Sequence, residues 1–172
     1  MTEDFLKVDD RSSGDANSSL GTTWRVVADT VMGGVSHGQL MPATVQGRAC
    51  LHMTGDVSLE NNGGFVQASL DLGVDAYLDA TRYSGFEIEV LGNAETYNLH
   101  LRTADTARVW QSYRASFIAL PQWQTLRFPF TDFKPHRLDT PLELRRLKRI
   151  GLVAIGRAFT ADLCFARVAL YR

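Results

Sequence analysis

Apolar and polar residues alternate one by one along several short segments of this chain, and this period constrains the fold more than any other feature. Residues 85–91 (GFEIEVL) and 97–103 (YNLHLRT) show it most clearly. Side chains that alternate with a period of two point to opposite faces of a β-strand, so one face carries the apolar set. The alternation therefore predicts strands of antiparallel sheets, each with one face packed in a core.

Turn residues divide the chain into further short segments of this kind. Strands are predicted at residues 24–28, 49–53, 65–70, 85–91, 97–103, 112–119, 123–128, 149–155 and 163–171. The glycine-containing connector at 92–95 predicts that the strands on either side of it form a hairpin. Only one helix start is recognisable, at Thr140-Pro141-Leu142-Glu143, where Thr140 is the predicted N-cap of a helix ending near Arg146.

Many short strands with almost no helix are typical of an all-β fold, here an antiparallel β-sandwich of the jelly-roll kind. A parallel sheet needs repeated crossover helices, for which the chain has no room. One domain is expected from a length of 172 residues, and we assign it to residues 24–172. Residues 1–23 are predicted to form an N-terminal strand containing Phe5 and Leu6, followed by a flexible polar arm or long loop at 9–23.

The charge and composition of the chain exclude several classes of protein. The net charge is −1, and the basic surplus around Arg145, Arg146, Lys148 and Arg149 is more typical of a solvated face than of a nucleic-acid site. No apolar stretch is long enough to cross a bilayer, so an integral membrane protein is not expected. The N-terminus lacks the features of a signal peptide, which favours a cytoplasmic location.

No cofactor or metal is expected from the residues that usually bind them. The two cysteines, Cys50 and Cys164, are read as buried free thiols, although one disulfide is an alternative. The histidines lack metal-ligand spacing, and no pattern of a catalytic nucleophile is visible. Asp29 and Asp162 are conceivable calcium ligands, but such a site needs six or more oxygen donors, which the sequence does not assemble.

Two glycine-rich motifs stand out. In the first, Asp29-Thr-Val-Met32-Gly33-Gly34-Val-Ser36-His-Gly38, the glycines indicate either a backbone of positive φ or a close approach by another group. A tight loop across one end of the sandwich is one interpretation, and contact with a partner is the other. The second motif, residues 58–65, has Glu60 followed by Asn61, Asn62, Gly63 and Gly64. Turn chemistry explains the asparagines and glycines, whereas Glu60 is left free to bind a partner loop, an amide or a cation.

A polar stripe is predicted if the strands pair in sequence order. Its members are Glu87, Glu89, Asn98, His100, Arg102, Arg114, Ser116, Thr125 and Arg127. Opposite charges on adjacent strands stabilise a sheet, which is one interpretation of the stripe. The alternative is a recognition face, with Trp110, Tyr113 or Trp123 at its rim.

The same residues carry a resemblance to a known family. Trp24-Arg25-Val26-Val27 before the first glycine motif, and Ser58-Leu59-Glu60-Asn61-Asn62-Gly63-Gly64-Phe65-Val66, are similar to the two hallmarks of the complex I intermediate-associated protein 30 family. The similarity extends from about residue 24 to 171, and the chain resembles a bacterial stand-alone member. The resemblance implies a galactose-binding-like jelly roll, a fold also seen in carbohydrate-binding modules. It further implies a role in assembly, since the mitochondrial member is an assembly factor of respiratory complex I.

Two functions are therefore considered besides an unrecognised enzyme. The first is a non-enzymatic protein-binding module, an assembly or chaperone-like factor for a membrane-bound redox complex, located in the cytoplasm or peripherally at the inner membrane. The second is a carbohydrate-binding module that holds a sugar ligand. The candidate binding residues are Asp29, Met32, Gly33, Gly34, Ser36, Glu60, Asn61, Asn62, Gly63, Gly64, Asn98, His100, Arg102, Trp110 and Tyr113. A pocket lined by Asp29, Glu60 and Arg102 would favour a small ligand, and a flat surface would favour a protein.

Overall fold

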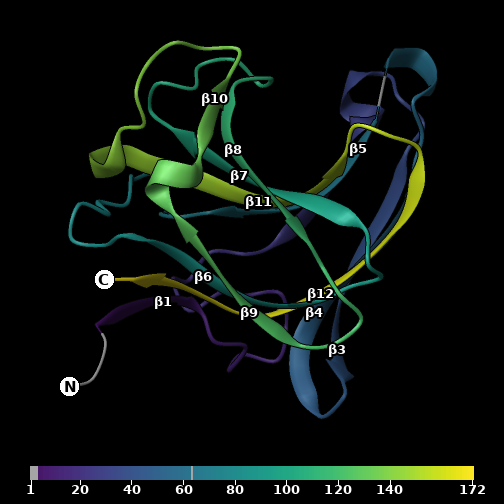
Figure 1. Cartoon of the computed structure of the whole chain (residues 1–172), viewed down its shortest axis with the longest axis horizontal. Coiled ribbons are helices and arrows are strands. Elements are labelled where there is room, and N and C mark those ends of the chain that lie inside the picture. The colour runs from purple at the N-terminus through teal and green to yellow at the C-terminus, as the bar shows by residue number, and fades with distance from the viewer. Residues whose placement is uncertain (1–3, 63) are drawn as a thin grey trace.

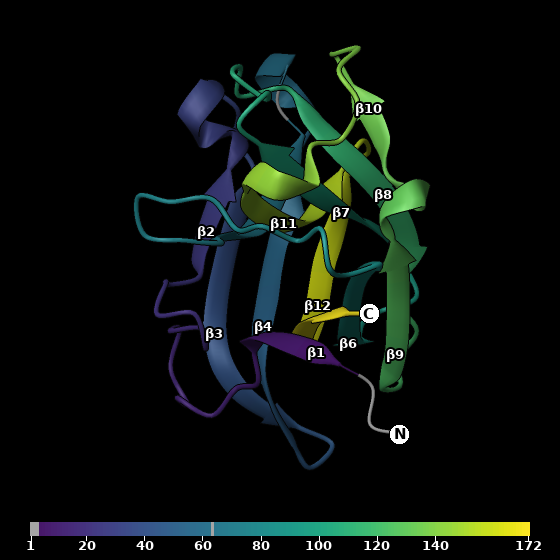
Figure 2. The same ribbon diagram turned by 90° about the vertical axis from the view of Figure 1, so that its left-hand side faces the viewer.

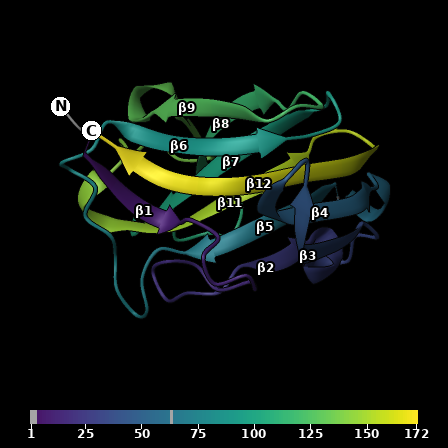
Figure 3. The same cartoon turned by 90° about the horizontal axis from the view of Figure 1, so that it is seen from below.

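Two antiparallel sheets face each other in the computed structural model, which describes residues 4–62 and 64–172 (Figure 1; Figure 3). We call them the β12 sheet and the β11 sheet after their central strands. The β12 sheet contains β1 (Phe5–Asp9), β3 (His37–Val45), β4 (Arg48–Val57), β6 (Gly85–Leu91), β9 (Gln124–Pro129) and β12 (Phe159–Tyr171). The β11 sheet contains β2 (Arg25–Ala28), β5 (Phe65–Asp71), β7 (Thr96–Thr103), β8 (Ser112–Ile118), β10 (Lys134–His136) and β11 (Leu147–Ile155).

The strand order is β3-β4-β12-β6-β9 in one sheet and β10-β8-β7-β11-β5-β2 in the other. Short 3-10 turns complete the described elements: η1 (Asp29–Met32), η2 (Glu60–Asn62), η3 (Phe130–Asp132) and η4 (Leu144–Arg146). This arrangement is the jelly-roll sandwich that the alternation predicted. The predicted strands are all present, with ends that differ by a few residues.

The core lies between the two sheets and is built by the predicted alternation. Phe86 and Ile88 of β6 are fully buried, and so are Leu99 and Leu101 of β7. Aromatic rings bridge the layers: the centroids of Phe117 in β8 and Phe128 in β9 are 5.4 Å apart, edge to face. The opposite faces of the strands are therefore left for polar side chains and for a binding site.

β12 organises its sheet because three strands pair with it. β6 lies along one edge, whereas β4 pairs with residues 159–165 and β1 with residues 168–171 on the other edge (Figure 3). β1 occupies Phe5–Asp9, within the segment where an N-terminal strand containing Phe5 and Leu6 was expected. It adds to the same sheet as the rest of the jelly roll.

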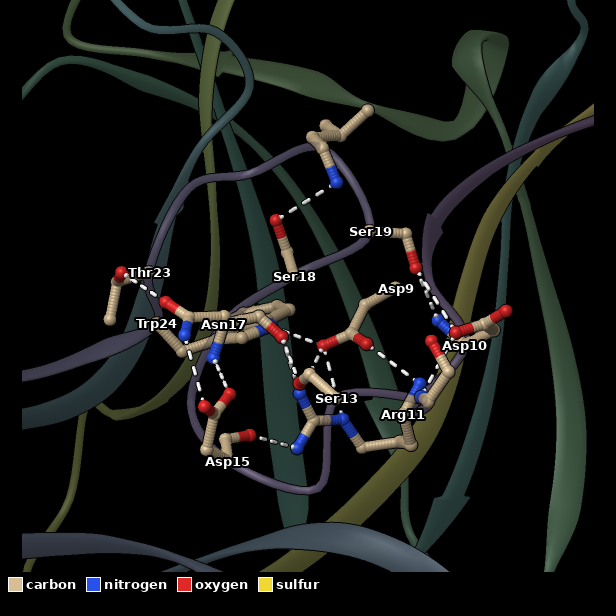
Figure 4. A network of polar contacts seen from close by, with 12 residues as sticks. Asp9, Asp10, Arg11, Ser13, Asp15, Asn17, Ser18, Ser19, Thr23 and Trp24 are labelled. Atoms are coloured by element: carbon tan, nitrogen blue, oxygen red, sulfur yellow. Dashed lines mark hydrogen bonds and ion pairs between the residues drawn. The ribbon is translucent and has the colours of Figure 1, made fainter.

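The polar segment after β1 forms a loop with its own hydrogen-bond network (Figure 4). The buried carboxylate of Asp9 accepts from Arg11 Nη2 at 2.7 Å and from the indole Nε1 of Trp24 at 2.6 Å. Arg11, also buried, donates from Nη1 to the carbonyl of Asp15 at 2.7 Å. These bonds connect the loop to Trp24 in the core. The flexibility expected for this segment stays a prediction.

The hairpin predicted for residues 85–103 is wrong. β6 belongs to the β12 sheet and β7 to the β11 sheet, so the connector at 92–95 crosses from one layer to the other. Gly92 N donates to the carbonyl of Leu120 at 2.8 Å, which places the connector against the β8–β9 connection. Turn residues specify that the chain changes direction, but they do not specify which sheet receives the next strand.

The helix predicted from Thr140 is also wrong. Only one 3-10 turn forms, η4, and Glu143 caps it by accepting from Arg145 N at 3.0 Å. The carbonyl of Thr140 instead accepts a hydrogen bond from the Tyr113 hydroxyl at 2.6 Å. A helix this short has few internal hydrogen bonds, and the buried Leu147 already begins β11.

One long strand, β3, was not predicted from the sequence. β3 contains Gly38 and Pro42, which interrupt any regular alternation. Proline is tolerated in a strand at the edge of a sheet, and β3 is the edge strand beside β4. Its position at the edge explains why the usual strand pattern is missing.

Candidate functional site

Asp29 holds the two glycine-rich loops together. Its buried carboxylate accepts hydrogen bonds from Ser36 N at 2.9 Å, from the Ser36 hydroxyl, and from the backbone N–H groups of Gly64 and Phe65. Burial acts to raise the pKa of Asp29, but the hydrogen bonds from Ser36, Gly64 and Phe65 outweigh it and the pKa is lowered. η1 and η2 accordingly lie side by side at one end of the sandwich (Figure 1; Figure 2).

The glycines of these loops have conformational reasons to be there. Gly33 has a φ of 85° after η1, and a Cβ atom on Gly34 would overlap the Asp29 carboxylate. In the second loop, Asn61 and Gly64 have φ values of 55° and 135°. The first of our two interpretations, a tight loop across one end of the sandwich, describes this geometry.

The structure leaves few of these loop residues accessible to a partner. Asp29, Gly34, Ser36 and Gly64 are buried, whereas Gly33, Glu60 and Asn61 are exposed. Gly63 and the side chains of Met32 and Asn62, also predicted binding residues, lie outside the described residues.

A pocket of about 400 Å³ lies on the outer face of the β11 sheet. We call it the β11 pocket. It is lined by Arg25, Val27, Phe65, Gln67, Ser69, His100, Arg102, Val109, Trp110, Gln111, Ser112, Arg114, Arg149, Ile150, Gly151, Val153 and Ile155. Its volume falls within the range typical of small-ligand sites in proteins.

The register of the β11 sheet brings the lining residues into rows across the strands. Gly151 of β11 lies between His100 of β7 and Ser69 of β5, and Arg114 of β8 pairs with His100 on the far side. Because Gly151 has no side chain, the end of the Gln67 side chain lies over it. The glycine and this amide therefore form the floor of the pocket.

Two arginines on the neighbouring strands β7 and β8, towards the Arg149 end of the pocket, have no carboxylate partner among the described residues. Arg102 donates from Nη2 to the carbonyls of Thr106 at 2.8 Å and Arg108 at 3.1 Å, while its buried Nε has no partner within the same residues. Arg114 donates from Nε to the Ser112 hydroxyl at 2.9 Å. A buried polar atom without a partner costs about 1–3 kcal/mol, so this end of the pocket is prepared for an acceptor.

His100 adds a second unpartnered polar atom. Its Nε2 is buried and makes no hydrogen bond within the described part of the chain. Burial, Arg114 and His136 together lower the pKa of His100 to about 3. The ring is therefore neutral at neutral pH, and it can offer one donor and one acceptor to a ligand.

The other two arginines of the pocket are partly neutralised. Asp71 lies 2.6 Å from Arg149 Nε and 3.6 Å from Arg25 Nη2. Arg149 was predicted to lie on a solvated face, yet it is half-buried and lines the pocket. The alternation could not reveal it, because its neighbours β5 and β7 are distant in sequence.

The three aromatic residues predicted for the rim lie in three different places. Trp110 lies at the rim, 55% exposed, with Arg108 5.9 Å from its ring centre. Tyr113 is buried in the core instead of at the rim, because residues alternate along β8 and its neighbours Ser112 and Arg114 face the pocket. Trp123 lies on the β12 sheet and donates from Nε1 to the carbonyl of Val45 at 3.0 Å.

The single polar stripe is wrong, because its members belong to different sheets. Glu87 lies on the β12 sheet and pairs with Arg127 at 2.8 Å and with Arg167 at 2.6 Å. Asn98, His100, Arg102, Arg114 and Ser116 share the outer face of the β11 sheet, but Asn98 and Ser116 do not line the pocket. Of the three residues expected around a ligand pocket, Arg102 lines it, whereas Asp29 and Glu60 do not.

Other predicted features can be placed directly. Cys50 and Cys164 are buried free thiols. Asp162 lies 2.6 Å from His52, away from Asp29, and no group of three or more metal-binding side chains occurs within residues 4–62 and 64–172. No helix in the described ranges has the length and apolar character to span a membrane.

Several solved structures of similar fold are carbohydrate-binding modules. The family 11 module of the cellulosomal cellulase Lic26A-Cel5E of Clostridium thermocellum has a TM-score of 0.74 and 12% identity, covering 99% of this chain and 95% of that one. A family 11 module from the same organism in complex with a β-1,3-1,4-mixed-linked tetrasaccharide has a TM-score of 0.72 and 10% identity, with 99% and 96% covered.

The family 30 module of the cellulase Cel9D-Cel44B of Clostridium thermocellum has a TM-score of 0.67 and 13% identity, with 96% of both chains covered. At these identities the likeness shows the jelly-roll fold alone. No curated protein matches the chain. A model of the family "Complex I intermediate-associated protein 30 (CIA30)" matches residues 14–163. The match spans both glycine-rich loops and the β11 pocket, and the chain thus belongs to the complex I intermediate-associated protein 30 family.

Proposed function

We propose that the protein is a non-enzymatic binding module that acts as an assembly factor for a membrane-bound redox complex of the respiratory complex I type. The family supports an assembly role, and the β11 pocket supports binding of a partner. The observation that carries the proposal is the pair of buried atoms, His100 Nε2 and Arg102 Nε, that lack a partner among the described residues and lie in one pocket. A partner that supplies hydrogen bonds to these atoms removes their desolvation cost on binding.

The contact surface that we propose is not limited to the two glycine-rich loops. It is the outer face of the β11 sheet, extended by the exposed residues of the second loop. Phe65 follows that loop directly and lines the apolar end of the pocket. Glu60 and Asn61 are therefore close enough along the chain to contribute to the same interface. Peripheral association with the cytoplasmic side of the inner membrane, through a subunit of the complex, belongs to the same proposal.

Affinity purification from the native host tests the assembly role. The tagged wild-type protein is expected to recover subunits of a membrane-bound redox complex. The double variant Arg102→Gln/Arg114→Gln is expected to recover much less of them. The matched control is Arg82→Gln/Arg172→Gln, which removes the same charge from two exposed arginines that both pair with Asp4. Recovery of no such subunits by the wild type would contradict the proposal.

A second candidate function is carbohydrate binding. The exposed ring of Trp110 at the rim of a pocket favours it, since sugars stack on aromatic faces. Several solved structures of similar fold are also carbohydrate-binding modules. A glycan array is the direct test. Hits that disappear in Trp110→Ala would support this function, and an array without hits at high protein concentration would remove it.

A further inference from the structure

The β11 pocket follows β11 and also crosses the sheet from β2 to β8. Its lining includes Arg149, Gly151, Val153 and Ile155, which alternate along this strand and face outward. A strand rises about 3.3 Å per residue, so the lining from Arg149 to Ile155 extends over about 20 Å. Six residues of an extended peptide have the same length. Along β11 the pocket therefore forms a groove long enough for an extended peptide.

One end of this groove is strongly cationic. Arg102 and Arg149 pair in its last row, Arg25 and Arg114 lie at the two ends of the adjoining row of Gly151, and no aspartate or glutamate is among the described residues of the lining. Asp71, just beside it, pairs with two of the four, which leaves Arg102 and Arg114 without a carboxylate in the described structure. A guanidinium fork matches the geometry of a carboxylate and binds it with two parallel hydrogen bonds. The missing partner in this end is thus an anion.

The opposite end of the groove is apolar. Ile155 pairs with Phe65 across β11 and β5, while Val153 and Val27 flank Gln67 in the next row. All four apolar residues line the pocket. This end buries apolar surface of a ligand, and it offers no charge to an anion.

The middle of the groove offers neutral polar groups, with Arg25 and Arg114 at the two ends of the same row. Ser69 of β5 lies on one side of Gly151 and His100 on the other, and the side-chain amide of Gln67, from the next row, reaches over the glycine. A primary amide and a neutral imidazole donate and accept hydrogen bonds, as a peptide backbone requires. A neutral sugar would use the same groups, but it would leave the two arginines without an acceptor of matching charge.

We infer that the β11 pocket binds an extended, acidic-to-apolar segment of a protein partner, with carboxylates on Arg102 and Arg114 and an apolar side chain between Val153 and Phe65. The inference rests on the proposed function, because it assigns the partner contact to a peptide segment. It goes further by naming the two ends of the segment and the residues that select them.

Selection from a peptide library tests this inference, because the library samples many segments at once and requires no particular partner protein. A displayed library of random eight-residue peptides is panned on the wild-type protein and depleted on Arg102→Gln/Arg114→Gln. Enriched peptides are expected to carry aspartate or glutamate at one end and large apolar residues at the other. A synthetic peptide of the enriched sequence should bind at least about tenfold more weakly when its carboxylates become amides, or when the double variant replaces the wild type. The control Arg82→Gln/Arg172→Gln should bind as the wild type does, and circular dichroism establishes that each variant is folded.

Four outcomes would overturn the inference. If the library enriches no peptide, or only peptides without acidic residues, the groove does not select an acidic segment. If a purely acidic peptide binds as tightly as the enriched peptide, the apolar end of the groove does not contribute to binding. If oligogalacturonate, a carboxylated sugar, binds and no peptide is enriched, the groove is a site for anionic glycans. If native subunits are recovered equally by the wild type and the double variant, the assembly role stands and the assignment of the groove is wrong.

Discussion

The side chain of Gln67 lies over Gly151: a Cβ atom on the glycine would be 2.5 Å from Gln67 Oε1. The two residues belong to neighbouring strands and lie one row apart in the register of the β11 sheet. The absence of a side chain at position 151 thus lets the amide lie across the floor of the pocket. Stability and binding are expected to respond differently to a change at this position.

Gly151→Ala should block the pocket while leaving the fold intact. The atom that the new methyl group displaces is the end of a flexible side chain, so we expect unfolding free energy to change by less than about 1 kcal/mol. Binding of a peptide selected on the wild type should weaken at least about tenfold. Thermal unfolding and calorimetric titration measure the two effects. A large fall in melting temperature would show that the glycine has a structural role instead.

His100→Leu should stabilise the protein and abolish binding. The buried Nε2 lacks a hydrogen bond within the described residues, so replacing the imidazole by an apolar group removes a desolvation penalty of about 1 kcal/mol. Denaturant unfolding measures the gain, and peptide titration measures the loss of binding. A destabilised variant would mean that His100 is held by interactions other than those described.

The lowered pKa of His100 predicts how stability depends on pH. The unfolded state binds a proton near pH 6.5 and the folded state only near pH 3, so unfolding free energy should fall as the pH drops from 6.5 towards 3. One such group contributes a slope of at most about 1.4 kcal/mol per pH unit. His100→Leu should lower this slope, while His136, whose pKa is also lowered by burial and by the arginines beside it, keeps its own contribution. Equal slopes in the two proteins would contradict the prediction.

Asp29→Asn should destabilise the protein by about 3 kcal/mol. The amide cannot accept all of the hydrogen bonds that the carboxylate receives from Ser36, Gly64 and Phe65, and its own N–H groups face these donors. The matched control is Glu60→Gln, an exposed change in the second loop, which should stay within about 0.5 kcal/mol of the wild type. If both variants were equally stable, Asp29 would not be the residue that holds the two glycine-rich loops together.

Asp9→Asn should release the polar loop. It leaves the buried Arg11 guanidinium without its carboxylate, a change that costs about 3–5 kcal/mol when a buried ion pair is broken. Limited proteolysis should then cut within residues 10–23, where the wild type resists. Asp10→Asn, the exposed neighbour, serves as the control. Rapid cleavage of the wild type in this segment would favour the flexible arm predicted from composition.

The strands could be predicted from the sequence because burial of one face leaves a local pattern. Residues 85–91 illustrate this, since their alternation places Phe86 and Ile88 in the core as expected. The partner of each strand leaves no such pattern. β11 lies between β5 and β7, which are far away in the chain, and the wrong hairpin at 92–95 arose from the same lack of information.

The candidate site was predictable to the same extent. His100 and Arg102 were identified by their polar positions on β7, and both line the pocket. Arg25, Gln67 and Gly151 were missed, because their roles depend on the register between distant strands. The Asp29 motif was recognised, but a sequence cannot show whether the groups that satisfy a carboxylate come from a partner or from the chain itself. Here they come from the chain.

The place of β12 in its sheet has a consequence for synthesis on the ribosome. β4, β6 and β1 all pair with a strand that follows every one of them in the chain. Until residues 159–171 leave the exit tunnel, these earlier segments have no centre on which to assemble, and their backbone groups stay available to chaperones or to neighbouring nascent chains. The sandwich is thus completed only after translation has passed Tyr171, however early its other layer has formed.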